Sequence, residues 1–181
     1  MKADIGAIVE SFGGPVSVAA NLPYYITTPI VMKLLEGGYG FKKIVIMVQK
    51  EVAERFCAAP GGKEYGAVTL GVQYRTDAKV ICHVGKEKFV PSPKVDSAVI
   101  EMTLLDEPRV KPKDEKFFFA VIKAAFAQRR KTLVNSLANA GKFGSKEKIT
   151  QAVTALGKDA NIRGEKLSIE EFCALSDILF E

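Results

Sequence analysis

The stretch Asn21-Leu22-Pro23-Tyr24-Tyr25 follows a short apolar run, Val16–Ala20, which predicts a buried strand. Strands do not usually end on a side-chain amide, a proline and two aromatic rings in succession. In an open α/β sheet, chemistry gathers at the carboxyl ends of the strands. The stretch therefore raises two questions together: whether the chain forms such a sheet, and what the end of this strand does.

Patterns of strands and helices alternate after this stretch. Further strands are predicted at Lys43–Val48, Lys79–Val84 and Ser97–Leu104. Helices are predicted after Thr28-Pro29, read as an N-cap followed by proline at the first helical position, and at 49–59 and 65–74. The alternation and the continuous apolar strands predict an α/β sheet with parallel members.

Two prolines among charged residues at 106–112 predict a linker, and the pattern beyond it is helical. Helices are predicted at 116–138 and 145–156, and the capping box Ser168-Ile169-Glu170-Glu171 predicts the start of a third. We therefore predict two domains, an α/β part at residues 1–108 and a small all-helical domain at residues 109–181.

The composition indicates a soluble globular chain: 48% of its 181 residues are hydrophobic and 26% are charged. No apolar run is long enough to span a bilayer, and Met1-Lys2-Ala3-Asp4 lacks the plan of a signal peptide. We expect a cytoplasmic protein with no membrane partner. The cysteines, Cys57, Cys82 and Cys173, are far apart, and His83 is the only histidine. We expect no metal site, and reduced, buried cysteines.

The net charge of +5 is unevenly distributed. Residues 1–108 carry 12 basic and 12 acidic side chains, whereas residues 109–181 carry 14 and 9. A localised positive excess indicates a polyanion partner such as RNA or DNA, and a solvated surface is the alternative. Three cations are spaced by seven residues, so a continuous helix 116–138 would place them on one stripe: Lys116, Lys123 and Arg130. Arg129 and Lys131 widen this stripe. Compensation of the helix dipole is the alternative explanation of these cations.

The residues Asn21–Tyr24 suit a reaction at the exocyclic amine of adenine. The lone pair of that amine is delocalised into the ring, and acceptors aimed at its N–H groups localise the pair on nitrogen. The Asn21 side-chain oxygen is one acceptor and the Leu22 carbonyl is a second, presented in a fixed direction before Pro23. Tyr24 can stack on the base, which must leave its own stack to enter. The alternative is a strand end followed by a proline turn, with Tyr24 and Tyr25 as packing.

The tetrad resembles the Asn/Asp-x-Pro-aromatic motif of S-adenosylmethionine-dependent methyltransferases that act on amino groups. Three longer stretches are more specific: Val48–Arg55, Phe89–Val99 (FVPSPKVDSAV) and Ala125–Leu133 (AFAQRRKTL). Together they resemble the ribosomal RNA adenine N6,N6-dimethyltransferases, the kasugamycin-resistance methyltransferase family. The resemblance covers essentially the whole chain.

The resemblance implies a fold, an activity and partners. The fold is a Rossmann-like methyltransferase sheet, here its C-terminal part, followed by a small helical, RNA-binding domain. The activity is methyl transfer from S-adenosylmethionine to two adjacent adenosines near the 3′ end of small-subunit rRNA in an assembling 30S particle. Residues Asn21–Tyr24 and Phe89 correspond to the catalytic site, and Asn21 also to a cofactor contact. In this context we expect the basic residues to contact phosphates.

The sequence departs from the family in its first half. Family members carry a glycine-rich loop after the first strand, and none of the clusters here, at 13–14, 37–40 and 61–62, follows a predicted strand and opens a helix. We therefore expect the glycine-loop half of the domain to be missing, with the chain beginning about 90 residues late judged by usual domain sizes. The exposed sheet edge then predicts aggregation, self-association, or a need for the missing half from another chain.

Two rival functions stay open. One is a catalytically inactive, truncated fragment that binds RNA or the 30S particle, which the missing glycine loop favours. The other is a DNA adenine N6-methyltransferase, which shares the tetrad chemistry, although the 89–99 stretch and the basic residues favour RNA.

Overall fold

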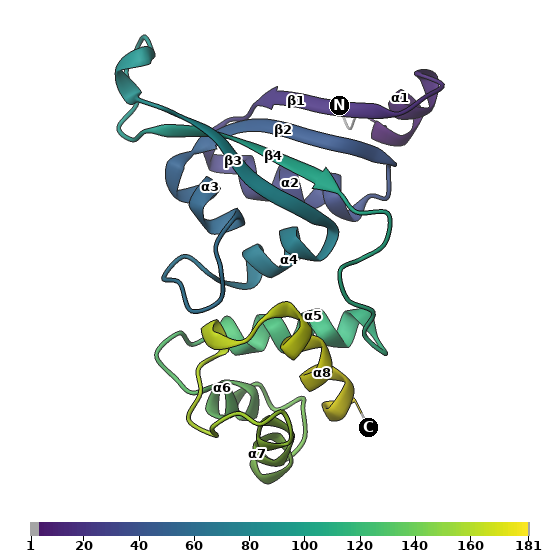
Figure 1. Ribbon diagram of the computed structural model, residues 1–181, viewed down its shortest axis with the longest axis vertical. Helices are drawn as coiled ribbons and strands as arrows, with labels where there is room; N and C mark the ends of the chain where they lie inside the picture. The colour runs from purple at the N-terminus through teal and green to yellow at the C-terminus, as the bar shows by residue number, and fades with distance from the viewer. Residues whose placement is uncertain (1–3, 181) are drawn as a thin grey trace. The chain divides into compact units, whose positions relative to one another are not determined.

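The computed structural model describes residues 4–180, so the predicted character of Met1–Ala3 lies outside it. The chain forms two compact units (Figure 1). The first, here called the sheet unit, comprises Met1–Cys57 and Arg75–Arg109. The second, the helical unit, comprises Ala58–Tyr74 and Val110–Glu181. Among the described residues, no helix is both long enough and apolar enough to cross a membrane.

The sheet unit holds one mixed sheet. Its strands are β1 (Val16–Asn21), β2 (Phe41–Gln49), β3 (Thr76–Val84) and β4 (Ser97–Leu104), in the order β1-β2-β4-β3. The four predicted strands are confirmed, but only β1 and β2 pair in parallel; β4 is antiparallel to both β2 and β3. The expected parallel character thus holds for a single pair, because β3 and β4 follow one another in the chain without a crossover helix.

One face of the sheet is buried. Three side chains of β2 lie directly opposite three of β4, and all six are at most 1% exposed: Ile44 and Met102, Ile46 and Ile100, Val48 and Ala98. Helices α2 (Thr27–Glu36) and α3 (Lys50–Phe56) lie on one side of the sheet (Figure 1) and bury side chains of their own. In the alternation of β2 and β4, Lys43 and Glu101 belong to the other set of side chains.

Glu101 is the centre of a charged cluster on the sheet. Its carboxylate pairs with Lys43 at 2.9 Å, from β2, and with Lys79 at 3.0 Å, from β3. Hydrogen bonds from these two lysines lower the pKa of Glu101 from its ordinary value. A face that carries such a cluster is partly solvated, which differs from a sheet of continuous, fully buried apolar strands.

Two helical starts in the sheet unit differ from expectation. Helix α2 begins at Thr27, after Ile26, so the prediction of Thr28 as its N-cap is wrong. The Thr27 hydroxyl instead donates to the Pro23 carbonyl at 3.1 Å. Helix α1 (Ile5–Ser11) was not predicted; it is capped by Asp4 and has no buried residue.

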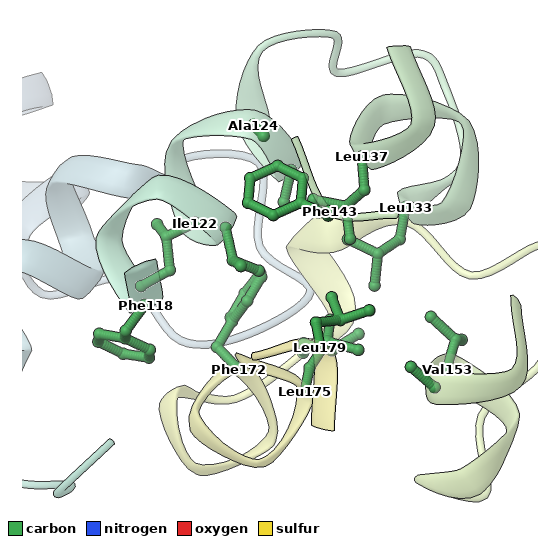
Figure 2. Close-up of a cluster of buried hydrophobic side chains, with 14 of the residues drawn as sticks. Phe118, Ile122, Ala124, Leu133, Leu137, Phe143, Val153, Phe172, Leu175 and Leu179 are labelled. Atoms are coloured by element: carbon green, nitrogen blue, oxygen red, sulfur yellow. The ribbon is translucent and has the colours of Figure 1, made fainter. Parts of the chain in front are cut away.

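The helical unit is built from α4 (Ala67–Arg75, whose last residue belongs to the sheet unit), α5 (Glu115–Phe126), α6 (Leu133–Ala140), α7 (Lys146–Ala155) and α8 (Ile169–Leu179). Side chains cap four of these helices at their N-termini, namely Asp114, Thr132, Ser145 and Ser168. The predicted capping box of Ser168 and Glu171 is confirmed. Figure 2 shows the core, in which side chains of α5, α6, α7 and α8 meet.

The boundary predicted between residues 108 and 109 misses a segment. Residues 58–74 precede β3, yet they belong to the helical unit. Tyr65 is 1% exposed and donates a hydrogen bond from its hydroxyl to the Leu167 carbonyl at 2.9 Å. Burial raises the pKa of Tyr65, with Glu170 and Glu171 adding to the rise. The continuous domain 1–108 is therefore interrupted, because this segment buries its aromatic residues among the C-terminal helices.

The helix predicted at 116–138 is broken. Helix α5 ends at Phe126 and α6 begins at Leu133, with Thr132 capping α6 through a bond from the Asn135 N–H at 3.3 Å. The Lys131 N–H closes a turn on the Gln128 carbonyl at 2.9 Å. The prediction that Lys116, Lys123 and Arg130 form one continuous stripe on a helix is therefore wrong, because Arg130 lies in the turn.

Candidate active site

The two sequence stretches that suggested a target-base site line one cleft. Its volume is about 340 Å³, and its lining residues are Asn21, Leu22, Pro23, Tyr24, Phe89, Pro91 and Pro93. The first four come from the end of β1 and the turn after it, and the others from the loop between β3 and β4, which extends beyond the sheet (Figure 1). All five residues predicted as catalytic are thus brought together, although they are up to 68 positions apart in the chain.

The hydrogen bonds around the tetrad leave two acceptors available. Asn21 is exposed at the last position of β1, and within residues 4–180 its side chain has no hydrogen-bond partner. The Leu22 N–H donates to the Met47 carbonyl at 3.5 Å, whereas the described residues offer no donor to the Leu22 carbonyl. The Pro23 carbonyl, by contrast, accepts from both the Ile26 N–H and the Thr27 hydroxyl. The free acceptors are therefore the two that the sequence analysis selected.

Tyr24 is held by a residue that the sequence analysis did not assign. Its hydroxyl lies 2.7 Å from the Ser97 Oγ, and either group can donate. Ser97 is the first residue of β4 and is fully buried. Tyr25, the next residue, is 85% exposed, so the packing role considered for both tyrosines is wrong for Tyr25. Ser97 was visible in the quoted stretch 89–99, but no pattern in the sequence pairs it with Tyr24.

The loop that carries Phe89 is braced by its own hydrogen bonds. The Asp96 carboxylate accepts from the Lys86 N–H at 3.1 Å, and the Ser92 hydroxyl donates to the Lys86 carbonyl at 2.9 Å. The Asp96 carbonyl accepts from the Lys50 N–H at 3.0 Å, which ties the loop to the start of α3. Phe89 is half-buried at the cleft, while Val90 beside it is fully exposed. These bonds stiffen the loop, and Pro91 and Pro93 stiffen it further because the proline ring fixes φ.

The cleft fits a planar base better than it fits a whole cofactor. The residues known to line it supply an amide, a carbonyl and two rings, and none of them is acidic. A ribose is usually held by a carboxylate that accepts from its hydroxyls. The glycine clusters also differ from a cofactor loop, because Gly13-Gly14 and Gly37-Gly38 follow helices α1 and α2, and Gly61-Gly62 lies between α3 and α4. Asn21 is the one predicted cofactor contact that the cleft contains.

The predicted basic residues lie in the helical unit, whereas the cleft belongs to the sheet unit. Lys116 and Lys123 are exposed on α5, and Arg130 and Lys131 are exposed in the turn after it, all without an ion pair among the described residues. Arg129 is different, because its guanidinium donates to the Lys63 carbonyl and lies 3.8 Å from the Glu165 carboxylate. Four of the five cations are thus available to an outside partner, and the fifth binds within the unit.

No group of three metal-ligating side chains occurs among residues 4–180. Cys82 is exposed and Cys57 and Cys173 are half-buried, so the expectation that all three are buried is wrong. Burial raises the pKa of the Cys57 and Cys173 thiols, which disfavours their reactive thiolate forms.

Comparison with known proteins places this chain in a family. A family model described as ribosomal RNA adenine dimethylase matches residues 1–181. The chain belongs to the ribosomal RNA adenine dimethylase family. The ribosomal RNA small subunit methyltransferase A of Bacillus licheniformis is 53% identical over 186 residues, a match that covers 100% of this chain and 64% of that protein. The protein of the same name from Clostridium acetobutylicum is 53% identical over 165 residues, covering 91% of this chain and 59% of that protein. This dimethylase-family chain therefore spans less than two thirds of the length of these curated relatives.

Solved structures agree on the fold. A dimethyladenosine transferase from Plasmodium falciparum superposes with a TM-score of 0.74 at 24% identity, covering 88% of this chain and 64% of that one. The 23S rRNA methyltransferase ErmE superposes with a TM-score of 0.67 at 20% identity, covering 92% of this chain and 66% of that one. The predicted fold class, the C-terminal part of a Rossmann-like methyltransferase sheet followed by helices, is thereby confirmed.

Proposed function

We propose that this chain supplies the target-base side of an rRNA adenine N6,N6-dimethyltransferase. The observation that carries the proposal is the pair of unpartnered acceptors, the Asn21 amide and the Leu22 carbonyl, in one cleft with the rings of Tyr24 and Phe89. The family and the names of the curated relatives support the same reaction. The substrate is small-subunit rRNA in an assembling 30S particle, and the methyl donor is S-adenosylmethionine.

The cleft residues act on the amine and on the base. An adenine that has left its stack enters between the two rings and gives up water contacts on its faces. Its exocyclic N–H groups donate to the Asn21 oxygen and the Leu22 carbonyl, which localises the lone pair on N6. S-adenosylmethionine, if bound, would supply the methyl group that this lone pair attacks; its sulfonium would leave as the thioether S-adenosylhomocysteine, and the amine would then lose one proton to solvent. Because the acceptors are fixed before the base arrives, their alignment costs little at the moment of transfer.

The helical unit supplies the electrostatic part of RNA binding. Lys116, Lys123, Arg130 and Lys131 are exposed cations without partners in the described chain, so they are free to neutralise phosphates. Arg129 contributes mainly by fixing the turn that presents Arg130 and Lys131. RNA hairpins are recognised largely through their backbone and through splayed loop bases, which suits a division between basic residues and a base cleft.

The Asn21→Ala variant tests the cleft assignment. Methyl transfer from labelled S-adenosylmethionine to immature 30S particles is measured with this chain expressed together with the remainder of a curated relative. We expect a loss of at least about a hundredfold in turnover, as for removal of a preorganised polar group, with RNA affinity unchanged. Asn161→Ala, which removes an exposed side-chain amide of the helical unit, is the control. Near-normal turnover of Asn21→Ala would refute the acceptor role.

A second candidate function is RNA binding without catalysis by residues 1–181 alone. The acid-free lining of the cleft favours it, because immobilising a free ligand costs several kcal/mol before any contact is made. We expect calorimetry of the chain with S-adenosylmethionine to show no binding, and filter binding with 30S particles to show affinity. A micromolar dissociation constant for the cofactor would refute this candidate. Methylation of naked DNA in place of 30S particles would instead indicate a DNA adenine methyltransferase.

A further inference from the structure

We propose that Ser97 is a positioning residue whose buried hydroxyl fixes the ring of Tyr24 in the cleft. The inference rests on the proposed function, because it concerns how the stacking surface for the target base is held. It is carried by the 2.7 Å contact between the Tyr24 hydroxyl and the Ser97 Oγ, across 73 positions of sequence.

Ser97 is well suited to serve as the fixed end of this contact. It is 0% exposed and begins β4 at the point where two other strands end. Its Cα lies in register with Gln49, the last residue of β2, and with Val84, the last residue of β3. The preceding residue, Asp96, is bonded through its carbonyl to Lys50 and through its carboxylate to Lys86. The backbone at Ser97 is therefore held from both sides and by the loop before it.

Tyr24 needs such a contact because its own segment holds it weakly. It opens a three-residue 3-10 helix, Tyr24–Ile26, whose N-cap makes no side-chain hydrogen bond. Tyr25 in the same turn is 85% exposed, so this turn does not bury an aromatic ring by itself. A bond at the far end of the Tyr24 side chain restricts both of its torsions together, which no contact at Cβ could do. The ring then presents one face to the cleft instead of sampling several orientations.

The contact also matters to Ser97. Within the described chain the Tyr24 hydroxyl is the only partner of the Ser97 Oγ, and a buried hydroxyl that loses its partner bears a desolvation penalty. The two hydroxyls therefore stabilise one arrangement of the cleft mutually. This links the tetrad Asn21–Tyr24 to the stretch Phe89–Val99, the two segments that line the cleft.

Carbon NMR on the chain labelled with ¹³C at tyrosine Cζ tests the proposal directly. The five tyrosines give five resonances, and Tyr24→Phe identifies the one that belongs to Tyr24. We expect Ser97→Ala to shift the Tyr24 resonance and leave the other four in place. Ser136→Ala is the matched control, since it removes a buried serine hydroxyl that has no hydrogen-bond partner among residues 4–180. A Tyr24 resonance unchanged by Ser97→Ala would overturn the proposal. If Ser97→Ala does not fold, Ser97→Cys carries the same expectation, because a thiol of similar size bonds more weakly.

Titration with adenosine separates this inference from the proposed function. In the native chain we expect adenosine to shift the Tyr24 resonance, and in Ser97→Ala to bind about fivefold more weakly, the usual worth of one hydrogen bond. Tyr24→Phe, which keeps the stacking ring and loses the bond, should weaken adenosine binding to a similar extent. Failure of adenosine to bind the native chain would count against the proposed base site, while the Ser97→Ala spectrum would still decide the contact. Equal adenosine affinity in the native chain and both variants would overturn the positioning role.

Discussion

The two units of the chain use their aromatic and apolar side chains in opposite ways. Seven large hydrophobic side chains are exposed among the described residues. One of them, Phe180, lies in the helical unit, and the other six lie in the sheet unit: Ile8, Phe12, Tyr25, Ile81, Val90 and Val95. The helical unit instead buries its rings against one another, as with Tyr74 and Phe118 at 5.6 Å between centroids. Four of its helices also have side-chain N-caps.

The difference indicates where each unit obtains its stability and where each offers a surface. The helical unit is stabilised by its own core and caps, so what it offers outward is charge. The sheet unit buries one face of its sheet and leaves apolar side chains exposed, of which Tyr25 and Val90 are next in sequence to residues that line the cleft. Exposed apolar groups of this kind mark binding surfaces when they gather in one place.

The strongest way to break this comparison is to remove one ring from each unit. Phe172→Ala in the helical unit should lower the free energy of unfolding by about 3–5 kcal/mol, because Phe172 is 0% exposed and leaves a cavity. Phe12→Ala in the sheet unit should change it by less than about 0.5 kcal/mol, since Phe12 is 68% exposed. Urea unfolding followed by circular dichroism measures both. Similar losses in the two variants would show that the exposed rings of the sheet unit are structural.

The second test asks whether the cations of the helical unit bind RNA at specific positions or only through the net charge of the unit. The variant Lys116→Ala, Lys123→Ala, Arg130→Ala should reduce the slope of log affinity for 30S RNA against log salt by about 2–3 units, roughly 0.7–0.9 per lost phosphate contact. The control removes two lysines and one arginine elsewhere in the same unit: Lys142, Lys146 and Arg163. A control that lowers the slope equally would mean that only the net charge of the unit matters.

The third test measures how much one helix N-cap contributes to the stability of each unit. Ser168→Ala removes the hydroxyl that accepts from the Glu171 N–H at 3.3 Å and should cost about 1 kcal/mol of stability. Asp4→Ala removes the carboxylate that accepts from the Ala7 N–H at 3.1 Å and caps α1, a helix with no buried residue, and should have almost no effect. Thermal unfolding of the two variants compares them. Equal shifts in Tm would contradict the view that capping matters more in the helical unit.

The smallest expected effect is a change in acid sensitivity. Burial raises the pKa of Glu171, but hydrogen bonds from Lys158 and from the Ser168 N–H outweigh it, so the pKa is lowered. The stabilisation is therefore complete above the ordinary glutamate pKa, about 4.3, and is lost as the pH falls through the lowered value. Glu171→Gln should reduce the loss of unfolding free energy at low pH by less than about 1 kcal/mol. Urea unfolding of the native chain and of Glu171→Gln at a series of pH values measures the difference, and an unchanged profile in Glu171→Gln would contradict the prediction.

Most of the fold could be predicted because its signals are local. The strands follow from apolar runs such as Lys43–Val48, and the start of α8 follows from a capping box whose residues are adjacent in sequence. The break between α5 and α6 was missed although Thr132 before Leu133 is an N-cap signal, because Leu133 follows Phe126 by seven residues, the spacing that a continuous helix would also show. The turn is further held by the Leu133 N–H, which donates to the Ile162 carbonyl at 2.7 Å, a contact with no trace in local sequence.

The candidate site was predictable in its residue types and not in its supports. Asn21 and Phe89 were identified from chemistry and resemblance, and the structure places both on one cleft. Ser97 and Thr27 were missed as supports, because a single serine or threonine carries no pattern until its partner is known. The involvement of Arg129 with Lys63 was missed for the same reason.

The passage of residues 58–74 into the helical unit has a consequence for synthesis and for dissection of the chain. These residues leave the ribosome before β3 and β4, whereas their partners in α5 to α8 are made after β4, so Tyr65 and Tyr74 stay exposed in the nascent chain until then. A fragment starting at residue 110 would lack both rings, so the core positions that they fill would be exposed to water. No single cut divides this protein into its two units, because each unit consists of two separate segments that would have to be joined: 1–57 to 75–109, and 58–74 to 110–181.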